Sequence, residues 1–321
     1  MAKLTTTDAI IKAMAKGSSG AKRLTDGAGS DVTTVIPTGI AALDKYVCGG
    51  GGLPCGRIVE LYGDAGVGKT SLCFAITANA QRLGFVTYFA ETESALSSAR
   101  MAAFGVDLSK VILTEPAHWG EVMEHMSEFL DALPDDQPAL VVLDSIAATP
   151  SIEEHEHGVG SQAKRDCRAK DLSQFMRRVT APVKRKKVCL LLVNQIRDNI
   201  GITFGSNVTT PGGHAVKFHA SLRLHLMGGK KDKDKDGVVD TIAPIAMADK
   251  NKVATPFRKA RIYLDIAGAR WDDDRSTLQL ARDLGLMSGR ERKTEKAIAL
   301  LEGHGSFKGD KTSGGSASGD A

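Results

Sequence analysis

Continuous apolar runs alternate with amphipathic stretches through the middle of this 321-residue chain. Runs such as Leu140–Asp144 are apolar at nearly every position, which is typical of parallel strands that helices cover on both faces. The pattern predicts an α/β fold with a mostly parallel central sheet covered by helices. The expected strands are Ile58–Tyr62, Val86–Ala90, Val111–Thr114, Leu140–Asp144 and Val188–Asn194, and the expected helices are Thr70–Leu83, Ala95–Phe104, Glu121–Leu130 and Leu172–Val183.

The two ends of the chain differ from this core. Thr7–Gly17 is typical of a short capped helix that ends at glycine, and a Gly/Ser/Asp-rich linker follows it. Three further strands are expected at His219–Met227, Asp240–Ala248 and Lys259–Ile266. We therefore divide the chain into a helix and linker (1–31), a core (32–268), a small C-terminal region (269–304) with helical stretches near Thr277–Leu284 and Glu295–Leu301, and a disordered tail (305–321).

The most specific motif lies between the first expected strand and the first expected helix of the core. Residues 63–70, Gly-Asp-Ala-Gly-Val-Gly-Lys-Thr, fit the phosphate-loop pattern G-x-x-x-x-G-K-[ST]. Such glycines let several backbone N–H groups point at one anion, and the helix N-terminus adds partial positive charge. We expect Lys69 to reach the phosphates and Thr70 to ligate Mg²⁺, in a nucleotide site made of Gly63, Asp64, Ala65, Gly66, Val67, Gly68, Lys69, Thr70 and Ser71.

Two strand ends supply candidate carboxylates for this site. Asp144 ends an apolar strand a domain's width after the phosphate loop, where a carboxylate is expected to hold the Mg²⁺ shell. The strand Val86–Ala90 leads into Glu91 and Glu93, and one of these glutamates is expected to activate the attacking water. Spacing alone leaves the choice between the two glutamates open.

Composition adds bounds on the class of protein. The formal net charge is +4, which is too small to identify a partner, and none of the five cysteines forms a C-x-x-C pair. These cysteines are typical of reduced core residues, not of a disulfide framework or a zinc site. The chain has no apolar run long enough to span a bilayer, so we expect a soluble, cytoplasmic protein with no membrane partner.

Basic residues concentrate in the segment from Lys164 to Lys187, within which Leu172 and Phe175 belong to an apolar helical stripe. This pattern predicts a helix that packs on the core through its apolar stripe. The simplest interpretation of its cationic face is a charged surface exposed to solvent. A second segment, Arg197–Gly213, is long for a strand-to-helix connection, which favours a functional loop. Its glycines, Gly212 and Gly213 among them, permit close approach to a sugar-phosphate chain, and Arg197 would attract phosphates.

The chain resembles the RecA-type recombinases of bacteria and phages over about Lys16 to Ala267. The resemblance runs through residues 51–60 (Gly-Gly-Leu-Pro-Cys-Gly-Arg-Ile-Val-Glu), 93–96 (Glu-Ser-Ala-Leu) and 143–148 (Leu-Asp-Ser-Ile-Ala-Ala). Its most specific parts are residues 193–197 (Val-Asn-Gln-Ile-Arg) and 209–218 (Thr-Thr-Pro-Gly-Gly-His-Ala-Val-Lys-Phe), followed by 250–252 (Lys-Asn-Lys) and 256–257 (Pro-Phe).

The resemblance assigns catalytic roles that spacing alone leaves open. It selects Glu93 as the catalytic base and implies that Gln195 senses the γ-phosphate and relays it to the loop that follows. Lys250 and Lys252 would reach the nucleotide of a neighbouring subunit and supply transition-state charge there. Where the family usually has Asp and Tyr beside the adenine, this chain has Ser97 and Arg100, and Arg100 is expected to stack on the base.

The resemblance also implies a DNA-binding surface. A first loop spans about His157–Arg165, with Arg165 at the position of the family's apolar wedge. Lys170 and Arg177 match positions that contact phosphates, and Ile200 matches a side chain that enters between base steps.

Together these features predict an ATP- and Mg²⁺-dependent recombinase that forms a helical filament on single-stranded DNA and pairs it with a homologous duplex. The N-terminal helix would dock on the next subunit of the filament, in a bacterial cytoplasm or in a host cytoplasm if the chain is phage-encoded. Two alternatives remain open: a ring-forming motor or loader built on the same ATPase core, and a nucleotide-dependent single-strand-binding module without strand exchange.

Overall fold

The computed structural model describes residues 5–15, 32–157, 163–198, 208–209, 211, 213–304 and 307. The chain forms two compact units, Met1–Thr33 and Thr34–Ala321. In the first unit, helix α1 spans Thr6–Ala15, which confirms the short helix expected there. Its start is capped reciprocally, because the Thr5 backbone N–H donates to Asp8 Oδ2 at 2.9 Å and the Asp8 N–H donates to Thr5 Oγ1 at 3.3 Å.

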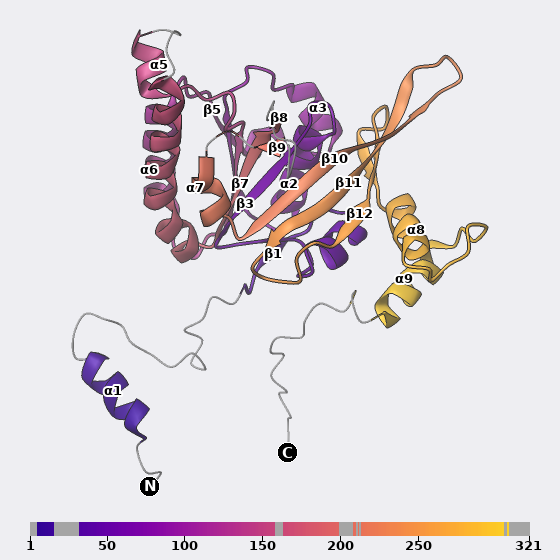
Figure 1. The fold of residues 1–321 in the computed structure, drawn as a ribbon, viewed down its shortest axis with the longest axis horizontal. Coiled ribbons are helices and arrows are strands. Elements are labelled where there is room, and N and C mark those ends of the chain that lie inside the picture. The colour runs from indigo at the N-terminus through magenta and orange to yellow at the C-terminus, as the bar shows by residue number, and fades with distance from the viewer. Residues whose placement is uncertain are drawn as a thin grey trace. The chain divides into compact units, whose positions relative to one another are not determined.

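The second unit is built on a ten-stranded, mostly parallel sheet, which confirms the predicted fold class (Figure 1). The strand order is β14-β13-β11-β10-β3-β7-β6-β4-β5, and β12 pairs with β11 beside this path. The strands from β10 to β5 pair in parallel, whereas β11, β12, β13 and β14 join antiparallel. The parallel part comprises β3 (Arg57–Gly63), β4 (Val86–Glu91), β5 (Val111–Thr114), β6 (Ala139–Asp144), β7 (Val188–Gln195) and β10 (Leu222–Lys233).

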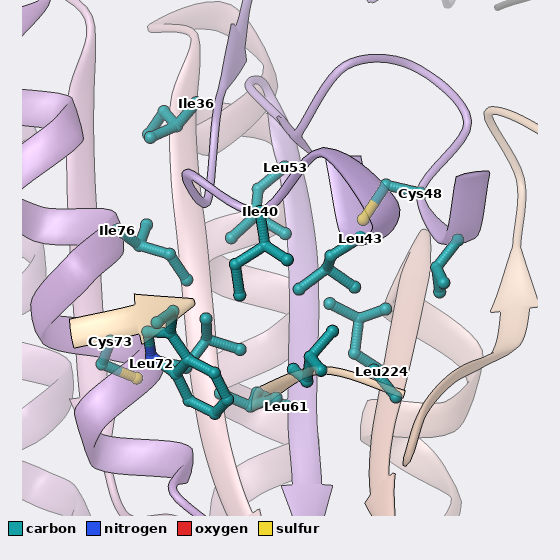
Figure 2. Packing of buried hydrophobic residues seen from close by; sticks show 14 of the residues in the cluster. Ile36, Ile40, Leu43, Cys48, Leu53, Leu61, Leu72, Cys73, Ile76 and Leu224 are labelled. Carbon is teal, nitrogen blue, oxygen red and sulfur yellow. The ribbon is translucent and has the colours of Figure 1, made fainter. Parts of the chain in front are cut away.

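Helices cover both faces of this sheet. On one face, α2 (Lys69–Arg82) and α3 (Ser98–Ala103) share a core with β1 (Val35–Ile36), β2 (Leu53–Pro54) and the π-helix η2 (Ala42–Val47). Figure 2 shows Leu72 and Ile76 of α2 packing in this core with Ile40, Leu43 and Leu61. On the other face lie α4 (Trp119–Ala132), α6 (Ala163–Arg185) and α7 (Gly213–His219). The central strands β3, β7, β6 and β4 therefore have side chains buried on both sides, as their apolar runs predict, whereas the edge strand β5 leaves Ile112 and Leu113 exposed.

Two of the later strand predictions are wrong in detail. His219 ends α7, because the Ala220 N–H still donates to Val216 O at 2.9 Å, and β10 begins only at Leu222. The stretch Lys259–Ile266 divides into β12 (Lys259–Arg261) and β13 (Tyr263–Asp265). The division falls opposite Pro244 of β11 (Val239–Asn251), which accepts a bond from the Ile262 N–H at 3.0 Å but has no N–H to return.

Several short elements were not predicted: β1, β2, η2, η3 (Leu108–Lys110), α5 (Ile152–His157), β8 (Arg197–Asp198), β9 (Val208–Thr209) and β14 (Arg270–Asp272). Six of these eight segments have only two or three residues, which is too short to display a hydrophobic period.

The C-terminal helices α8 (Asp273–Asp283) and α9 (Thr294–Gly303) confirm the two expected helical stretches. Strand β14 pairs with β13 across the predicted boundary between residues 268 and 269. The Ala41 N–H donates to Asp273 Oδ1 at 2.6 Å, and Ala297 and Leu301 belong to the core shared with α2. The domain division stays a prediction. Within the described part of the chain, no helix is long and apolar enough to cross a bilayer.

Candidate nucleotide-binding site

The phosphate loop connects the end of β3 to the start of α2. Gly66 and Gly68 have φ angles of +72° and +94°, a region that residues with a β-carbon rarely adopt. A β-carbon on Gly68 would also lie 3.2 Å from Leu264 Cδ2 and from Trp271 Cη2. Glycine is therefore required at position 68 for both conformation and space, and the tight curl leaves the loop's N–H groups available for an anion.

Lys69 places its ammonium group within this loop. Its Nζ donates to the carbonyl oxygens of Gly63 at 2.9 Å and of Asp64 at 2.6 Å. Burial lowers the pKa of Lys69, and the negative charges of Asp144, Glu93 and Asp64 oppose that shift. The loop therefore holds a desolvated cation that an anion can approach closely.

Thr70 and Asp144 meet beside the loop. The Thr70 hydroxyl donates to Asp144 Oδ2 at 2.9 Å. Burial raises the pKa of Asp144 to about 7, partly offset by this hydrogen bond, and the charges of Glu93 and Glu91 raise it further. A hydroxyl and a carboxylate are both oxygen ligands, and Mg²⁺ is commonly held by one or two carboxylates together with substrate phosphates and water. The residues present therefore fit Mg²⁺.

The two candidate glutamates have different surroundings. Glu91 is buried, and its Oε1 accepts the backbone N–H groups of Glu93 at 2.7 Å and Ala95 at 3.3 Å, so it stabilises the turn after β4. Glu93 is exposed, and its Oε1 accepts bonds from Gln195 Nε2 at 2.9 Å and from the Ser145 hydroxyl. Only Glu93 therefore presents its carboxylate to the space above the loop.

These groups line one cleft of about 270 Å³ at the carboxyl ends of the parallel strands. Arg100 also lies in this cleft, where its Nη2 donates to Ser71 Oγ at 3.2 Å. Gly63, Asp64 and Val67 shape the loop without lining the cleft, and Val67 is buried in the core below it. The lining residues are Ala65, Gly66, Gly68, Lys69, Thr70, Ser71, Glu93, Arg100, Asp144, Gln195, Ile242 and Leu264.

Ile242 and Leu264 are the lining residues that sequence reasoning missed. They come from β11 and β13, far along the chain from the phosphate loop. Each belongs to an ordinary apolar strand pattern, so no signal in the sequence distinguishes them from core residues.

Lys250 and Lys252 do not line the cleft of their own chain. The Lys250 ammonium donates to the Lys217 and Phe218 carbonyl oxygens, at 2.5 and 3.1 Å, at the end of α7. Lys252 is exposed. Burial lowers the pKa of His219, and the positive charges of Arg177, Lys250 and Lys252 lower it further. These three cations therefore act on a common imidazole at the end of α7.

The expected DNA-facing residues are described only in part. Lys170 and Arg177 are exposed on α6, away from the nucleotide cleft. Arg165 lies in α6, Arg197 in β8 and Gly213 at the start of α7, each described by its backbone alone. Ile200 and Gly212 lie outside the described residues.

A phosphate loop between β3 and α2, with acidic groups at the ends of neighbouring parallel strands, defines a P-loop NTPase. The family model described as the RecA N-terminal domain matches residues 4–268 of the chain. The chain is 35% identical to Protein RecA of Thermotoga neapolitana over an aligned region of 254 residues. This region covers 79% of this chain and 70% of that protein. It is 34% identical over 304 residues to Protein RecA of Heliobacterium modesticaldum, covering 95% and 82%. The chain belongs to the RecA family of ATP-dependent DNA recombinases.

Proposed function

We propose that the cleft binds ATP with Mg²⁺, and that its hydrolysis resets a helical filament of this protein on single-stranded DNA. The filament pairs its strand with a homologous duplex in recombination and DNA repair. The observation that carries this proposal is the convergence of Lys69, Thr70, Asp144 and Glu93 on one cleft of about 270 Å³. We place this activity in the cytoplasm of a bacterium, or in the host cytoplasm if the chain is encoded by a phage.

Each residue of the cleft takes a distinct part in hydrolysis. Lys69 and the loop N–H groups hold the β- and γ-phosphates, where positive charge stabilises the transition state. Thr70 and Asp144 hold Mg²⁺, which when bound neutralises phosphate charge. Glu93 accepts the proton of the attacking water. Gln195, whose Nε2 already contacts Glu93 Oε1 at 2.9 Å, responds to the γ-phosphate.

The proposal places each nucleotide between neighbouring subunits. The family resemblance implies that Lys250 and Lys252 act on a neighbouring nucleotide, and their position outside their own cleft is compatible with that role. Helix α1 would dock on the adjacent subunit. Lys170, Arg177 and Arg197 would neutralise DNA phosphates, Arg165 and Ile200 would contact bases, and Gly212 and Gly213 would let the backbone approach the strand closely.

A lysine pair provides the test. Lys69→Ala removes the buried ammonium from the loop, and Lys110→Ala removes an exposed ammonium paired with Asp107. We expect Lys69→Ala to abolish ATP binding and DNA-stimulated hydrolysis, and Lys110→Ala to match the unaltered protein. Nucleotide binding is measured with a fluorescent ATP analogue and turnover by phosphate release. Normal turnover in Lys69→Ala would remove the assignment of the cleft.

The alternatives are separated by a second experiment. Electron micrographs of the protein with single-stranded DNA and a non-hydrolysable ATP analogue should show helical filaments. Closed rings would instead favour a motor or loader. Filaments without joint-molecule formation in a D-loop assay would indicate a binding module that lacks strand exchange.

A further inference from the structure

Three residues that line the nucleotide cleft take no part in the binding of phosphate or metal described above. Arg100 comes from α3, and Ile242 and Leu264 come from β11 and β13. Among the hydrogen bonds of the described residues, none connects the Arg100 side chain to Glu93 or Asp144. These three residues are therefore available to the part of a nucleotide that the phosphate loop does not hold.

Ile242 and Leu264 form one apolar surface, which we call the apolar pair. They are register partners on the antiparallel strands β11 and β13, so their side chains are neighbours on the same face of the sheet. Leu264 Cδ2 lies 3.2 Å from the position that a β-carbon on Gly68 would take. The apolar pair therefore borders the phosphate loop directly, where it favours contact with the flat face of a nucleobase.

Arg100 brings a cation with open hydrogen-bond donors to the same cleft. Its Nη2 donates to Ser71 Oγ at 3.2 Å, at the start of α2. The side chain is exposed, and no ion pair formed by the described residues includes it. A guanidinium has five N–H donors and no acceptor. Arg100 therefore keeps donors available for a ligand in the cleft.

A group that only donates distinguishes the two purines. Guanine presents two acceptors, O6 and N7, on one edge, whereas adenine presents the acceptor N7 beside the donor N6. The Ser97 hydroxyl is not available to accept from adenine N6, because it accepts the Arg100 backbone N–H at 3.3 Å as the cap of α3. The carboxylates that line the cleft, Glu93 and Asp144, take the parts in hydrolysis proposed above. The hydrogen bonding offered by Arg100 therefore matches guanine better than adenine.

We propose that the nucleobase lies against the apolar pair while the Arg100 guanidinium donates to its edge, so that GTP is a substrate of this cleft beside ATP. Arg100 is then the residue that sets base specificity, with two N–H groups directed at O6 and N7 of guanine. The proposal rests on the proposed function, since it needs a triphosphate held by the phosphate loop. It extends the substrate class from adenine nucleotides to purine nucleotides.

The specificity is measured as a ratio: kcat/KM for GTP divided by kcat/KM for ATP, from phosphate release with single-stranded DNA. We expect a ratio of one or more in the unaltered protein. A bidentate contact discriminates between bases by about 5- to 150-fold, so Arg100→Ala should lower the ratio by a factor in this range. Arg100→Gln should lower it further, because a glutamine amide can donate to N7 and accept from N6 of adenine.

Arg82→Ala is the matched control, because Arg82 is an exposed helical arginine whose Nη1 donates to Asn79 Oδ1 outside the cleft. Its ratio should equal that of the unaltered protein. A ratio clearly below one in the unaltered protein overturns the proposal. Equal losses of ATP and GTP turnover in Arg100→Ala also overturn it, because Arg100 would then stack on either base or bind phosphate.

The same measurements separate this proposal from the proposed function. If the unaltered protein hydrolyses neither nucleotide, the assignment of the cleft to ATP hydrolysis fails. Hydrolysis of ATP without hydrolysis of GTP refutes only the role of Arg100 in base recognition.

Discussion

The nucleotide cleft and a second polar cluster both use strand β3, and they differ in how their charges are paired. In the second cluster, which we call the polar bridge, Glu60 of β3 accepts hydrogen bonds from Asn194 of β7 and Arg223 of β10. Glu60 lies within this strand and Gly63 ends it, so the two regions are only three residues apart. In the cleft, the carboxylate of Glu93 remains exposed. In the polar bridge, the Glu60 carboxylate is fully buried and already paired with Arg223. A ligand can complete the first region, whereas the second is complete within the chain.

This difference separates two kinds of polar site. A site that receives a ligand keeps open donors and acceptors, so removing a side chain changes binding or chemistry while the fold survives. A closed internal pair offers nothing to a ligand, and removing one partner leaves an uncompensated buried group. Substitutions in the cleft should therefore act on turnover, and substitutions in the polar bridge should act on stability.

The largest expected effect is that of Glu93→Gln in the cleft. Loss of a general base lowers kcat on the order of 10²–10⁴-fold, while ATP and DNA binding are retained. Glu91→Gln is the neighbouring control, because its Oε1 can still accept the Glu93 and Ala95 N–H groups and should change kcat little. Single-turnover hydrolysis measures both. A dead Glu91→Gln beside an active Glu93→Gln would reverse the assignment.

Next in size is the loss of stability in the polar bridge. Arg223→Ala leaves Glu60 buried without its cation, which should lower the free energy of unfolding by about 3–5 kcal/mol. The control is Arg270→Ala, since the Arg270 side chain is 71% exposed in its pair with Asp265. Its loss should cost about 1 kcal/mol or less. Urea denaturation measures the free energy of unfolding of both variants. If Arg223→Ala loses no more stability than Arg270→Ala, removing Arg223 does not leave Glu60 as an uncompensated buried charge.

A smaller effect is expected when two impaired variants are mixed. If Lys250 acts on the neighbour's nucleotide, Lys250→Ala and Glu93→Gln subunits in one filament form some interfaces with both groups intact. The mixture should then hydrolyse ATP faster than the sum of the two variants measured separately. DNA-stimulated phosphate release at several mixing ratios checks this. Strict additivity at every ratio would show that Lys250 acts within its own subunit.

The smallest expected effect concerns the exposed surface of α6. Arg177→Ala should flatten the slope of log affinity against log salt by about 0.7 for single-stranded DNA, because one phosphate contact is lost. Fluorescence anisotropy over a salt series measures the slope, with Lys110→Ala as an exposed control. Base preference should not change, since phosphate contacts carry no sequence information. An unaltered slope would remove Arg177 from the DNA surface.

Much of the fold could be predicted because it depends on local patterns. The strand expected at Val111–Thr114 has the same bounds in the structure, and the run at Leu140–Asp144 gains only Ala139. The second run is recognisable because a strand buried on both faces has to be apolar throughout, and the first because its β-branched and apolar residues favour a strand although it lies at the edge of the sheet. The helix and strand around His219 could not be separated in this way, since a short apolar stretch is compatible with either.

The cleft was predictable to the extent that its parts follow one another in sequence. The phosphate loop is recognisable because consecutive residues must meet both a backbone and a charge requirement, as Gly68 and Lys69 do. Ile242 and Leu264 carry no such requirement, and only the pairing of β11 with β13 brings them to the cleft. The roles of Lys250 and Lys252 stay predictions.

The sequence by itself determined the phosphate loop, the apolar strands and the family, because each depends on neighbouring residues or on matching along the whole chain. Spacing left the choice between Glu91 and Glu93 open and the family resemblance favoured Glu93, but only the tertiary structure shows the physical difference: Glu91 is buried, and Glu93 lines the cleft. The tertiary structure also shows how Glu60, a charged residue in an apolar strand, is buried and paired. Its partners, Asn194 and Arg223, lie more than 130 residues along the chain, at separations of 134 and 163, and reach it only through strand order. Long-range pairing places these charges where water cannot screen them, and no local pattern records that placement.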